Sequence, residues 1–456
     1  MTRRAGLARW ADRGTRLALA LLVVAMPFRA RSDVVARPPE AVSAVLADLV
    51  VYAVDVVVVL AIGLWLLARG LDRRRIELGP RALRLLALVI VGLAWLTIPF
   101  GVEPAVSVAG AIRITAGAVL ALVVLDEVES LAGLAVPVAA MLAIQAAVGI
   151  GQAATGGALG LAAIGELPLD PAHAGTSVVT AADGTRYLRA YGLTPHPNVL
   201  GGFLACGLVL LLAAPTTSRL ARLAQAAVVV VATAGLVVTF SRGAWLAGLA
   251  GLVVSLVVLA GIGARPPVRR WLAGAVLVVA VAAAVGWLAR DPIASRTWLA
   301  PSASATEQRS VDERLEQIRL GWRVVLDRPL TGAGASAVPI AMRQLEPDFE
   351  FAFYAPHLVP LAVAGELGIA GGLAYLGLMA APWVLLASSR RRWTIELAGA
   401  SAALAALAVV SGFDDYPWVG GPGRTLGWFV LGLWVMAWTR AGRGRPGTAA
   451  TGIHDG

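Results

Sequence analysis

The sequence predicts an all-α, multi-pass membrane protein with about 12 transmembrane helices and a long loop that contains an amphipathic helix. Of the 456 residues, 58% are hydrophobic and only 14% are charged, whereas a soluble domain carries about 25% charged residues. Several apolar runs reach the length of about 18 residues that is needed to cross the hydrocarbon core of a bilayer. These observations exclude a soluble globular protein.

The apolar runs define the expected helices and divide the chain. We expect spans at 17–30, 42–68, 82–100, 104–125, 130–152, 197–214, 222–240, 243–263, 271–289, 357–387, 397–413 and 425–439. The first span is short and follows arginines, as in a signal peptide, but no small-residue cleavage site follows it, so we expect it to remain as an anchor. The resulting segments are 1–152 (spans one to five), an outer loop at 153–196, 197–289 (spans six to nine), a long outer loop at 290–356, 357–439 (spans ten to twelve) and a tail at 440–456.

The distribution of arginine predicts the orientation, since all 38 basic residues are arginine. Twenty-two of them lie in the two termini and in the connections at 69–84, 215–222, 264–270 and 388–393, whereas the alternate short connections hold seven. Cytoplasmic loops carry the excess of positive charge. We therefore expect both termini in the cytoplasm and the loops at 153–196 and 290–356 on the outer face. Arginines spread over short loops do not favour nucleic-acid binding.

The stretch VVTFSRGAWLAG (237–248) contains one arginine among apolar residues. Residues 222–263 would form a helix about 63 Å long, which is two crossings, so a tight turn is expected near Ser241, Arg242 and Gly243. Ser241 can cap the following helix, and Gly243 suits the backbone of a turn. Two interpretations of Arg242 stay open: the side chain reaches lipid headgroups, or it binds an anion at the membrane surface.

The two long outer loops carry further candidate side chains. In the first, Arg186, Arg189 and His196 come just before span six, which begins at Pro197 and Asn198; proline at a helix start is ordinary. In the second, SVDERLEQIRLGWRVVLDRP predicts an amphipathic helix for the membrane surface. The apolar stripe of this helix would consist of Val311, Leu315, Ile318, Trp322 and Val325. Ser310 and Glu313 would form its capping box, and Pro329 would end it. Its other faces carry Arg314, Arg319, Arg323 and Arg328. Most such arginines are solvated, and the TGAGASA segment that follows (331–337) is typical of a turn.

Several charged residues lie within or beside the later spans. His357 opens span ten, and Glu366 follows nine residues later on the opposite side of the helix, so a His–Glu pair is excluded unless Pro360 bends the helix. Glu366 is a functional candidate because a carboxylate within a membrane span is energetically unfavourable. Asp55 and Arg113 could form a structural ion pair.

No metal site or cofactor is expected. Asp414 and Asp415 lie in the outer loop GFDDYPWVGGPGR (412–424), where no D-x-D or histidine-rich signature accompanies them. The acidic DEVES segment (126–130) is predicted on the cytoplasmic side. The single cysteine, Cys206, lies in an apolar run, which excludes a disulfide framework and a cysteine metal site.

Four stretches between about residues 186 and 420 resemble the O-antigen ligase family, which includes O-antigen polymerases and protein O-oligosaccharyltransferases. RAYGLTPHPNVLG resembles the family's R-x-x-G followed by P-N, and TFSRGAW resembles its S-R-G turn. RLEQIRLGWRVVLDRPLTGAGAS resembles its R-helix-P-x-x-G-x-G element, and HLVPLAVAGELGIAGG resembles its H-N-x-x-L followed by E-x-G. The chain departs from the last motif because Leu358 stands where the family usually has asparagine.

The resemblance implies a metal-independent membrane glycosyltransferase with a membrane-embedded, helical glycosyltransferase fold in the cytoplasmic membrane. Such enzymes move a glycan from a polyprenyl pyrophosphate carrier to an acceptor hydroxyl on a lipid or glycan outside that membrane. The implied catalytic residues are Arg242, Arg314 and His357, with Arg189, Asn198, Ser241, Glu366 and Asp414 as substrate-binding candidates. Guanidinium groups can hold the pyrophosphate bidentately, and histidine can accept the proton of the acceptor.

Two other functions remain open at this stage. A polymerase of the same family would use the same carrier and the same residue types. A transporter would use the arginines to bind a permeating anion or a lipid-linked substrate, but it predicts paired broken spans in two related halves. The sequence shows no such repeat.

Overall fold

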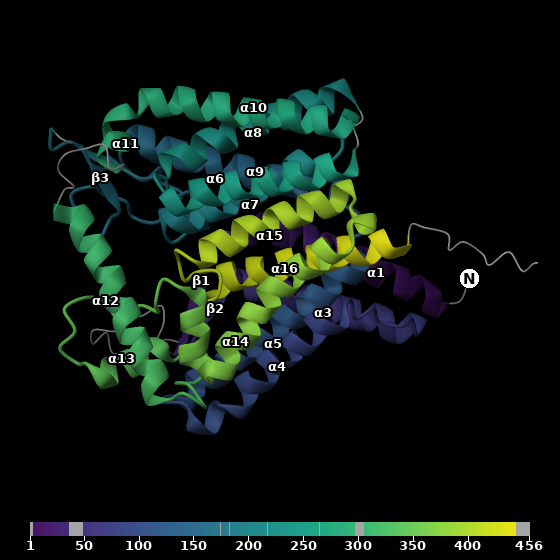
Figure 1. Ribbon diagram of the computed structural model, residues 1–456, viewed down its shortest axis with the longest axis horizontal. Helices are drawn as coiled ribbons and strands as arrows, with labels where there is room; N and C mark the ends of the chain where they lie inside the picture. The colour runs from purple at the N-terminus through teal and green to yellow at the C-terminus, as the bar shows by residue number, and fades with distance from the viewer. Residues whose placement is uncertain are drawn as a thin grey trace, which may run out of the picture.

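The computed structural model describes residues 3–35, 49–173, 175–181, 183–216, 218–263, 265–296 and 305–443. Helices account for most of this chain (Figure 1). The first half contains α1 (Arg3–Ala25), α3 (Ala53–Asp72), α4 (Arg81–Leu96), α5 (Pro104–Glu127), α6 (Ala135–Thr155) and α7 (Pro197–Ala213). The second half contains α8 (Arg219–Val238), α9 (Arg242–Ile262), α10 (Arg265–Leu288), α11 (Arg290–Arg296), α12 (Ala305–Asp327), α13 (Val338–Leu345), α14 (Val359–Ser388), α15 (Ile395–Ser411) and α16 (Gly421–Arg443). Short 3₁₀ turns lie at Ile98–Phe100, Leu131–Leu134, Ala162–Ile164 and Arg390–Arg392.

The long helices run side by side in one bundle, and α12 lies across one end of it (Figure 1). The helices α7, α15 and α16 form the centre, where nearly every residue of α7 and α15 is buried. A helix that is apolar on all sides is stable only when it is enclosed by other helices, and α9 and α5 supply part of that enclosure along α15 and α16.

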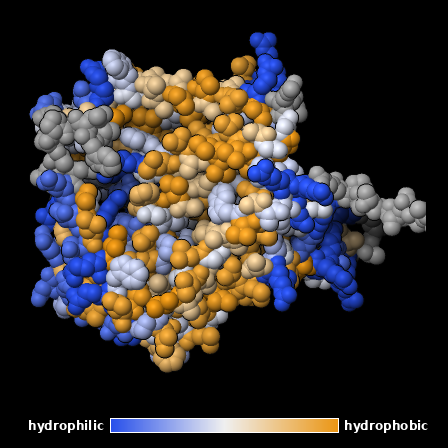
Figure 2. All heavy atoms as spheres, viewed as in Figure 1, coloured by the Kyte–Doolittle hydropathy of each residue, from blue (hydrophilic) through white to orange (hydrophobic). Residues whose placement is uncertain are grey.

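Seven helices in the described residues are long and apolar enough to cross a membrane: α3, α5, α6 with the turn before it, α8, α9, α10 and α14. The apolar helices α7 and α15 are shorter. Figure 2 shows hydrophobic side chains across the middle of the molecule and hydrophilic ones gathered at its two ends. These features establish a multi-pass helical membrane protein, while the expected number of 12 spans stays a prediction.

Two expected boundaries are wrong. The first helix ends at Ala25 rather than at residue 30, because Pro27 cannot continue it. The second begins at Ala53; residues 49–52 form strand β2, and residues 42–48 lie outside the described chain.

The prediction of an all-α fold also needs a correction, since two small hairpins are present. Strand β1 (Arg31–Val35) pairs with β2 (Leu49–Tyr52), and β3 (Val178–Thr180) pairs with β4 (Arg186–Leu188). Both pairs are antiparallel and lie at the end of the bundle that α12 crosses (Figure 1).

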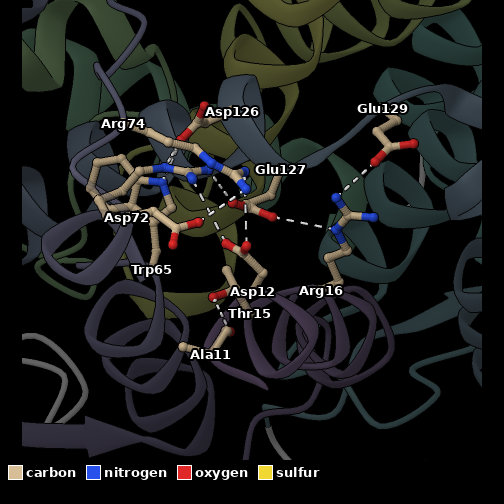
Figure 3. A network of polar contacts seen from close by, with 11 residues as sticks. Ala11, Asp12, Thr15, Arg16, Trp65, Asp72, Arg74, Asp126, Glu127 and Glu129 are labelled. Atoms are coloured by element: carbon tan, nitrogen blue, oxygen red, sulfur yellow. Dashed lines mark hydrogen bonds and ion pairs between the residues drawn. The ribbon is translucent and has the colours of Figure 1, made fainter. Parts of the chain in front are cut away.

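A buried charge network joins three helices at the opposite end (Figure 3). The Arg69 guanidinium on α3 contacts Asp126 and Glu127 at the end of α5, and its Nη1 lies 3.7 Å from Asp12 Oδ1 on α1. Trp65 Nε1 donates a 2.7 Å hydrogen bond to Asp126. The acidic 126–130 segment therefore lies at the same end of the bundle as the arginine-rich 69–84 connection. This agrees with the prediction that both segments are on the same side of the membrane.

The predicted ion pair within the bundle is confirmed. Arg113 Nε on α5 lies 3.4 Å from Asp55 Oδ2 on α3. Asp55 also accepts a hydrogen bond from the backbone N–H of Tyr52, at the start of its own helix. The pair explains how two ionisable side chains are accommodated in apolar segments, because each offsets the desolvation of the other.

Candidate active site

The predicted turn between α8 and α9 is present. Phe240 has a positive φ of 49°, and Ser241 caps α9 by accepting a hydrogen bond from the backbone N–H of Ala244. Gly243 was expected to provide the unusual backbone conformation, and this is wrong: it lies within the first turn of α9, beside Phe413. Arg242 is the first residue of α9 and is half-buried, so it projects from a fixed turn next to the 412–420 loop.

Arg189 is the buried centre of a hydrogen-bond network around this turn. Its Nε donates to the Thr239 carbonyl (2.7 Å), its Nη1 to Ser177 Oγ (2.8 Å) and its Nη2 to Asn198 Oδ1 (2.6 Å). The side chain is only 5% exposed. These bonds engage all three guanidinium nitrogens, so Arg189 holds Thr239, Ser177 and Asn198 together.

The network continues through Asn198 to His357. Asn198 Nδ2 donates a 2.7 Å hydrogen bond to Asp414 Oδ2, and the other carboxylate oxygen of Asp414 lies 3.3 Å from His357 Nδ1. Asp415 Oδ1 lies 3.6 Å from the same nitrogen. Residues from four segments of the chain thus converge, and a carboxylate on Nδ1 fixes the orientation of the imidazole ring.

The electrostatics of the site follow from burial and from these contacts. Burial opposes a charge on His357, but the hydrogen bond to Asp414 and the charges of Asp415 and Asp414 outweigh it and raise the pKa of His357. Burial likewise disfavours a charge on Asp414, yet His357 and Arg314 together hold its pKa well below the usual range. Burial raises the pKa of Asp415 to about 7, and the negative charge of Asp414 adds to this.

His196 has a different role from His357. It precedes α7, and its Nδ1 accepts a 3.2 Å hydrogen bond from the backbone N–H of Asn198. Burial and the charge of Arg189 lower the pKa of His196 to about 3. This histidine therefore stays neutral and caps the helix that carries Asn198.

Arg314 is brought to this cluster by α12. Its positive charge acts on His357, Asp414 and His196, lowering the pKa of each. The neighbouring arginines on α12 have other partners: Arg319 and Arg323 bind Glu346, and Arg328 donates to the Phe100 carbonyl. Among the predicted arginines of this helix, Arg314 is the one whose charge reaches the histidine cluster.

One expectation about α12, its starting residue, is wrong. The helix begins at Ala305, before the predicted capping box at Ser310 and Glu313, because alanine, glutamate and glutamine extend it toward the N-terminus. Leu320, Val324 and Val325 are enclosed by the protein, whereas Val311, Leu315 and Trp322 of the predicted apolar stripe are 43%, 59% and 52% exposed. The exposed apolar face agrees with the expected position at a membrane surface.

Glu366 belongs to a second polar cluster rather than to the His357 cluster. It is 1% exposed and accepts a 2.9 Å hydrogen bond from Trp418 Nε1. Arg424 is 3% exposed; its Nε donates to the Trp418 carbonyl, and its Nη2 donates to Ser336 Oγ at 3.2 Å. Arg424 was expected only as a loop arginine; its guanidinium lies 5.3 Å from the centroid of the Trp418 ring, and the aromatic residues of the preceding loop were a signal for this contact.

The helix that follows His357 is broken at Gly368, which has φ 76°. Pro360 was considered as the source of a bend, but it lies in the first turn, where proline is compatible with a helix. The turn at 331–337 fills the break: Ala333 N and Gly334 N donate to the carbonyls of Gly365 and Glu366. The turn that follows α12 is therefore hydrogen-bonded directly to the helix that begins after His357.

The ligand atoms of His357, Asp414 and Asp415 lie within 4.8 Å of one another. One imidazole nitrogen and two carboxylate oxygens suit a divalent cation, so these residues could hold one. The same atoms also form a hydrogen-bonded acid–histidine cluster. The expectation of no metal stays a prediction.

The fold and this cluster define a multi-pass membrane protein with a buried polar site at one end of its helices. A family model described as O-antigen ligase matches residues 226–376, and this confirms the resemblance to that family over about a third of the chain. The matched segment runs from α8 into α14 and contains Arg242, Arg314, His357 and Glu366. A comparison with curated protein sequences gives no match.

Proposed function

We propose that this protein transfers a glycan from a polyprenyl pyrophosphate carrier to an acceptor hydroxyl on the outer face of the cytoplasmic membrane. The observation that supports this most is the chain of contacts from Arg189 through Asn198 and Asp414 to His357. It holds a histidine at the end of the helix bundle, close to the charge of Arg314. This arrangement suits a proton acceptor beside a cationic site.

Arg242 and Arg314 are proposed to bind the pyrophosphate of the carrier. Guanidinium groups stay charged at neutral pH and bind phosphate oxygens through two parallel hydrogen bonds. They also stabilise the negative charge that develops on the leaving pyrophosphate. Arg189 is assigned to positioning alone, because its nitrogens already donate to Thr239, Ser177 and Asn198.

His357 is proposed as the general base. The acceptor hydroxyl gives its proton to Nε2, and its oxygen forms the new bond to the anomeric carbon. The bond from that carbon to the terminal phosphate oxygen breaks, and the polyprenyl pyrophosphate leaves with the electron pair. Asp414 stabilises the resulting imidazolium through Nδ1, and the proton then passes to solvent.

The acceptor separates two forms of this proposal. A ligase would transfer the glycan to a lipid-linked acceptor, and a polymerase would transfer it to another glycan on a carrier. Both use the same donor and the same proposed roles of His357, Arg242 and Arg314. Transport of the donor is less well supported, because transport alone does not require a proton acceptor such as a histidine held between two carboxylates.

The test is a transfer assay with the purified full-length protein, a polyprenyl pyrophosphate-linked glycan and an acceptor in detergent or vesicles. We expect a new glycan–acceptor bond and free polyprenyl pyrophosphate, with the rate unchanged by excess EDTA. Movement of the intact donor across the vesicle without bond formation would favour transport. Loss of activity in EDTA with rescue by Mg²⁺ or Mn²⁺ would instead assign a cation to His357, Asp414 and Asp415.

A further inference from the structure

Arg29 is a charged side chain without a partner in the part of the chain that the structure describes. It follows α1 and is half-buried, and its Nη1 is enclosed but has no hydrogen-bond acceptor. No carboxylate forms an ion pair with it among the described residues. A buried charged donor without an acceptor is energetically unfavourable. Such a group can accept an anion as its partner.

The side chains around Arg29 are also cationic. Arg31 on β1 lies 3.5 Å from Asp33, and Arg113 lies 3.4 Å from Asp55, so each of these arginines has one carboxylate. Tyr52 pairs with Arg31 across the β1–β2 hairpin, and the Arg113 guanidinium lies 5.8 Å from the centroid of the Tyr52 ring. Among the residues that the structure describes, these three arginines have two carboxylates as ion-pair partners, so one positive charge is not offset there.

The titration behaviour agrees with this charge balance. Burial and the charge of Arg31 lower the pKa of Arg29. Burial raises the pKa of Tyr52 despite the charges of Arg31 and Arg113, so its hydroxyl stays protonated and can donate. An anion at this place would relieve the repulsion between the arginines and accept hydrogen bonds from them.

We propose that Arg29, Arg31 and Tyr52 form a phosphate-binding site that is separate from the His357 cluster. The site lies at the same end of the bundle, because the backbone N–H of Arg29 donates a 3.0 Å hydrogen bond to the Leu193 carbonyl, in the loop before Asn198. The phosphate can be inorganic phosphate or the headgroup of a phospholipid at the membrane surface. A bound phosphate would connect the end of α1 to the loop that precedes α7.

Isothermal titration calorimetry with inorganic phosphate tests the site on the purified full-length protein. The proteins are the wild type, R29Q, R242Q and the R29Q/R242Q double variant, with R186Q as a control for an exposed arginine at the same end. We expect R242Q and R186Q to keep phosphate binding at this site, and R29Q/R242Q to bind at least roughly tenfold more weakly than R242Q, as expected for one lost charge-assisted bond. Equal affinity of R242Q and R29Q/R242Q for phosphate would overturn the proposal. This result does not depend on whether Arg242 binds the donor or whether the protein catalyses transfer.

Thermal unfolding without phosphate provides a second measurement. If Arg29 is an unpaired charge, neutral glutamine should leave Tm unchanged or raise it, because no native partner is lost. A fall in Tm of several degrees relative to R186Q would show that Arg29 supports the fold and would contradict the site.

Native mass spectrometry distinguishes the two sources of phosphate. The wild type and R29Q are compared in phosphatidylcholine nanodiscs with and without phosphatidylglycerol. Retention of phosphatidylglycerol by the wild type but not by R29Q would identify a lipid headgroup as the ligand. Calorimetric binding without lipid retention would identify free phosphate, and the absence of both would overturn the proposal.

Discussion

At the scale of single residues, Arg189 and Arg242 show how the same side chain acquires two roles. Arg189 is 5% exposed and donates to three different partners. Arg242 is half-buried and starts α9 directly after the Ser241 cap. A replacement at Arg189 therefore changes the geometry of the site, whereas a replacement at Arg242 tests contact with the substrate.

We predict that Arg242→Lys lowers transfer roughly tenfold or more and that Arg242→Ala lowers it further. Lysine keeps the charge but loses the planar fork, so two parallel hydrogen bonds to phosphate become one point contact. Both variants should fold, because Ser241 and the flanking helices keep the turn. The measurement is turnover normalised to inserted protein, and a fully active lysine variant would mean that Arg242 only reaches lipid headgroups.

The pH dependence of transfer should report the state of His357. The base must be neutral, so the rate should rise with pH through a midpoint above the ordinary histidine pKa of about 6.5, since Asp414 and Asp415 raise the pKa of His357. Asp414→Asn removes one negative charge beside His357, and the amide oxygen of the new side chain can still accept the hydrogen bond from Asn198 Nδ2. Its midpoint should move to lower pH by about one unit or more. A midpoint of kcat/KM that is the same in both proteins would show that another group titrates.

At the scale of elements, the turn after α12 and the break in α14 form one unit. A Cβ on Gly368 would collide with the Leu330 carbonyl, and one on Gly332 would collide with the backbone of Glu366. The N–H of Ile369, which follows the break, donates a 2.8 Å hydrogen bond to the Pro329 carbonyl. These close contacts fix α12, which carries Arg314, relative to the helix that follows His357.

Gly368→Ala should therefore lower both stability and transfer. A positive φ costs a non-glycine residue about 1–3 kcal/mol, and the collision with Leu330 adds to this. Gly63→Ala in α3 is the matched control, because its added Cβ meets no atom within 4 Å. Thermal unfolding of both variants in detergent tests the claim; a Gly368→Ala protein as stable and active as Gly63→Ala would show that the break is dispensable.

The sequence predicted the elements better than their contacts. Apolar length gave the helices, and a proline or a cap often marked their ends, as at Pro197 and Ser241. The enclosed face of α12 was not predictable, because Val311, Leu315 and Trp322 on its exposed side are apolar as well. The roles of Asn198, Asp414 and Arg424 depend on contacts between segments up to 216 residues apart, which no local pattern encodes.

At the scale of the whole molecule, the two ends of the bundle differ in chemistry. One end holds His357, Arg189, Arg242 and the hairpins, and the other holds the Arg69 network and the arginine-rich connections (Figures 1 and 3). The excess of arginine predicts that the second end faces the cytoplasm. The proposed active site would then face outward, where acceptors for an exported glycan would be found.

Reporter fusions test this orientation. Fusions after residues 75 and 391 should report the cytoplasm, because these connections carry clusters of arginine. Fusions near residues 175 and 345 should report the outside. A cytoplasmic signal at 345 would place the His357 cluster on the wrong side for the proposed reaction.

The most direct test of the account is transfer by His357→Ala measured together with binding of the pyrophosphate-linked donor. A general base acts in the transition state, so its loss should lower turnover by about 10²–10⁴-fold while donor affinity, which depends on the arginines, stays nearly constant. Turnover of about a third of the wild type or more would contradict the account, since loss of a general base cannot be that mild.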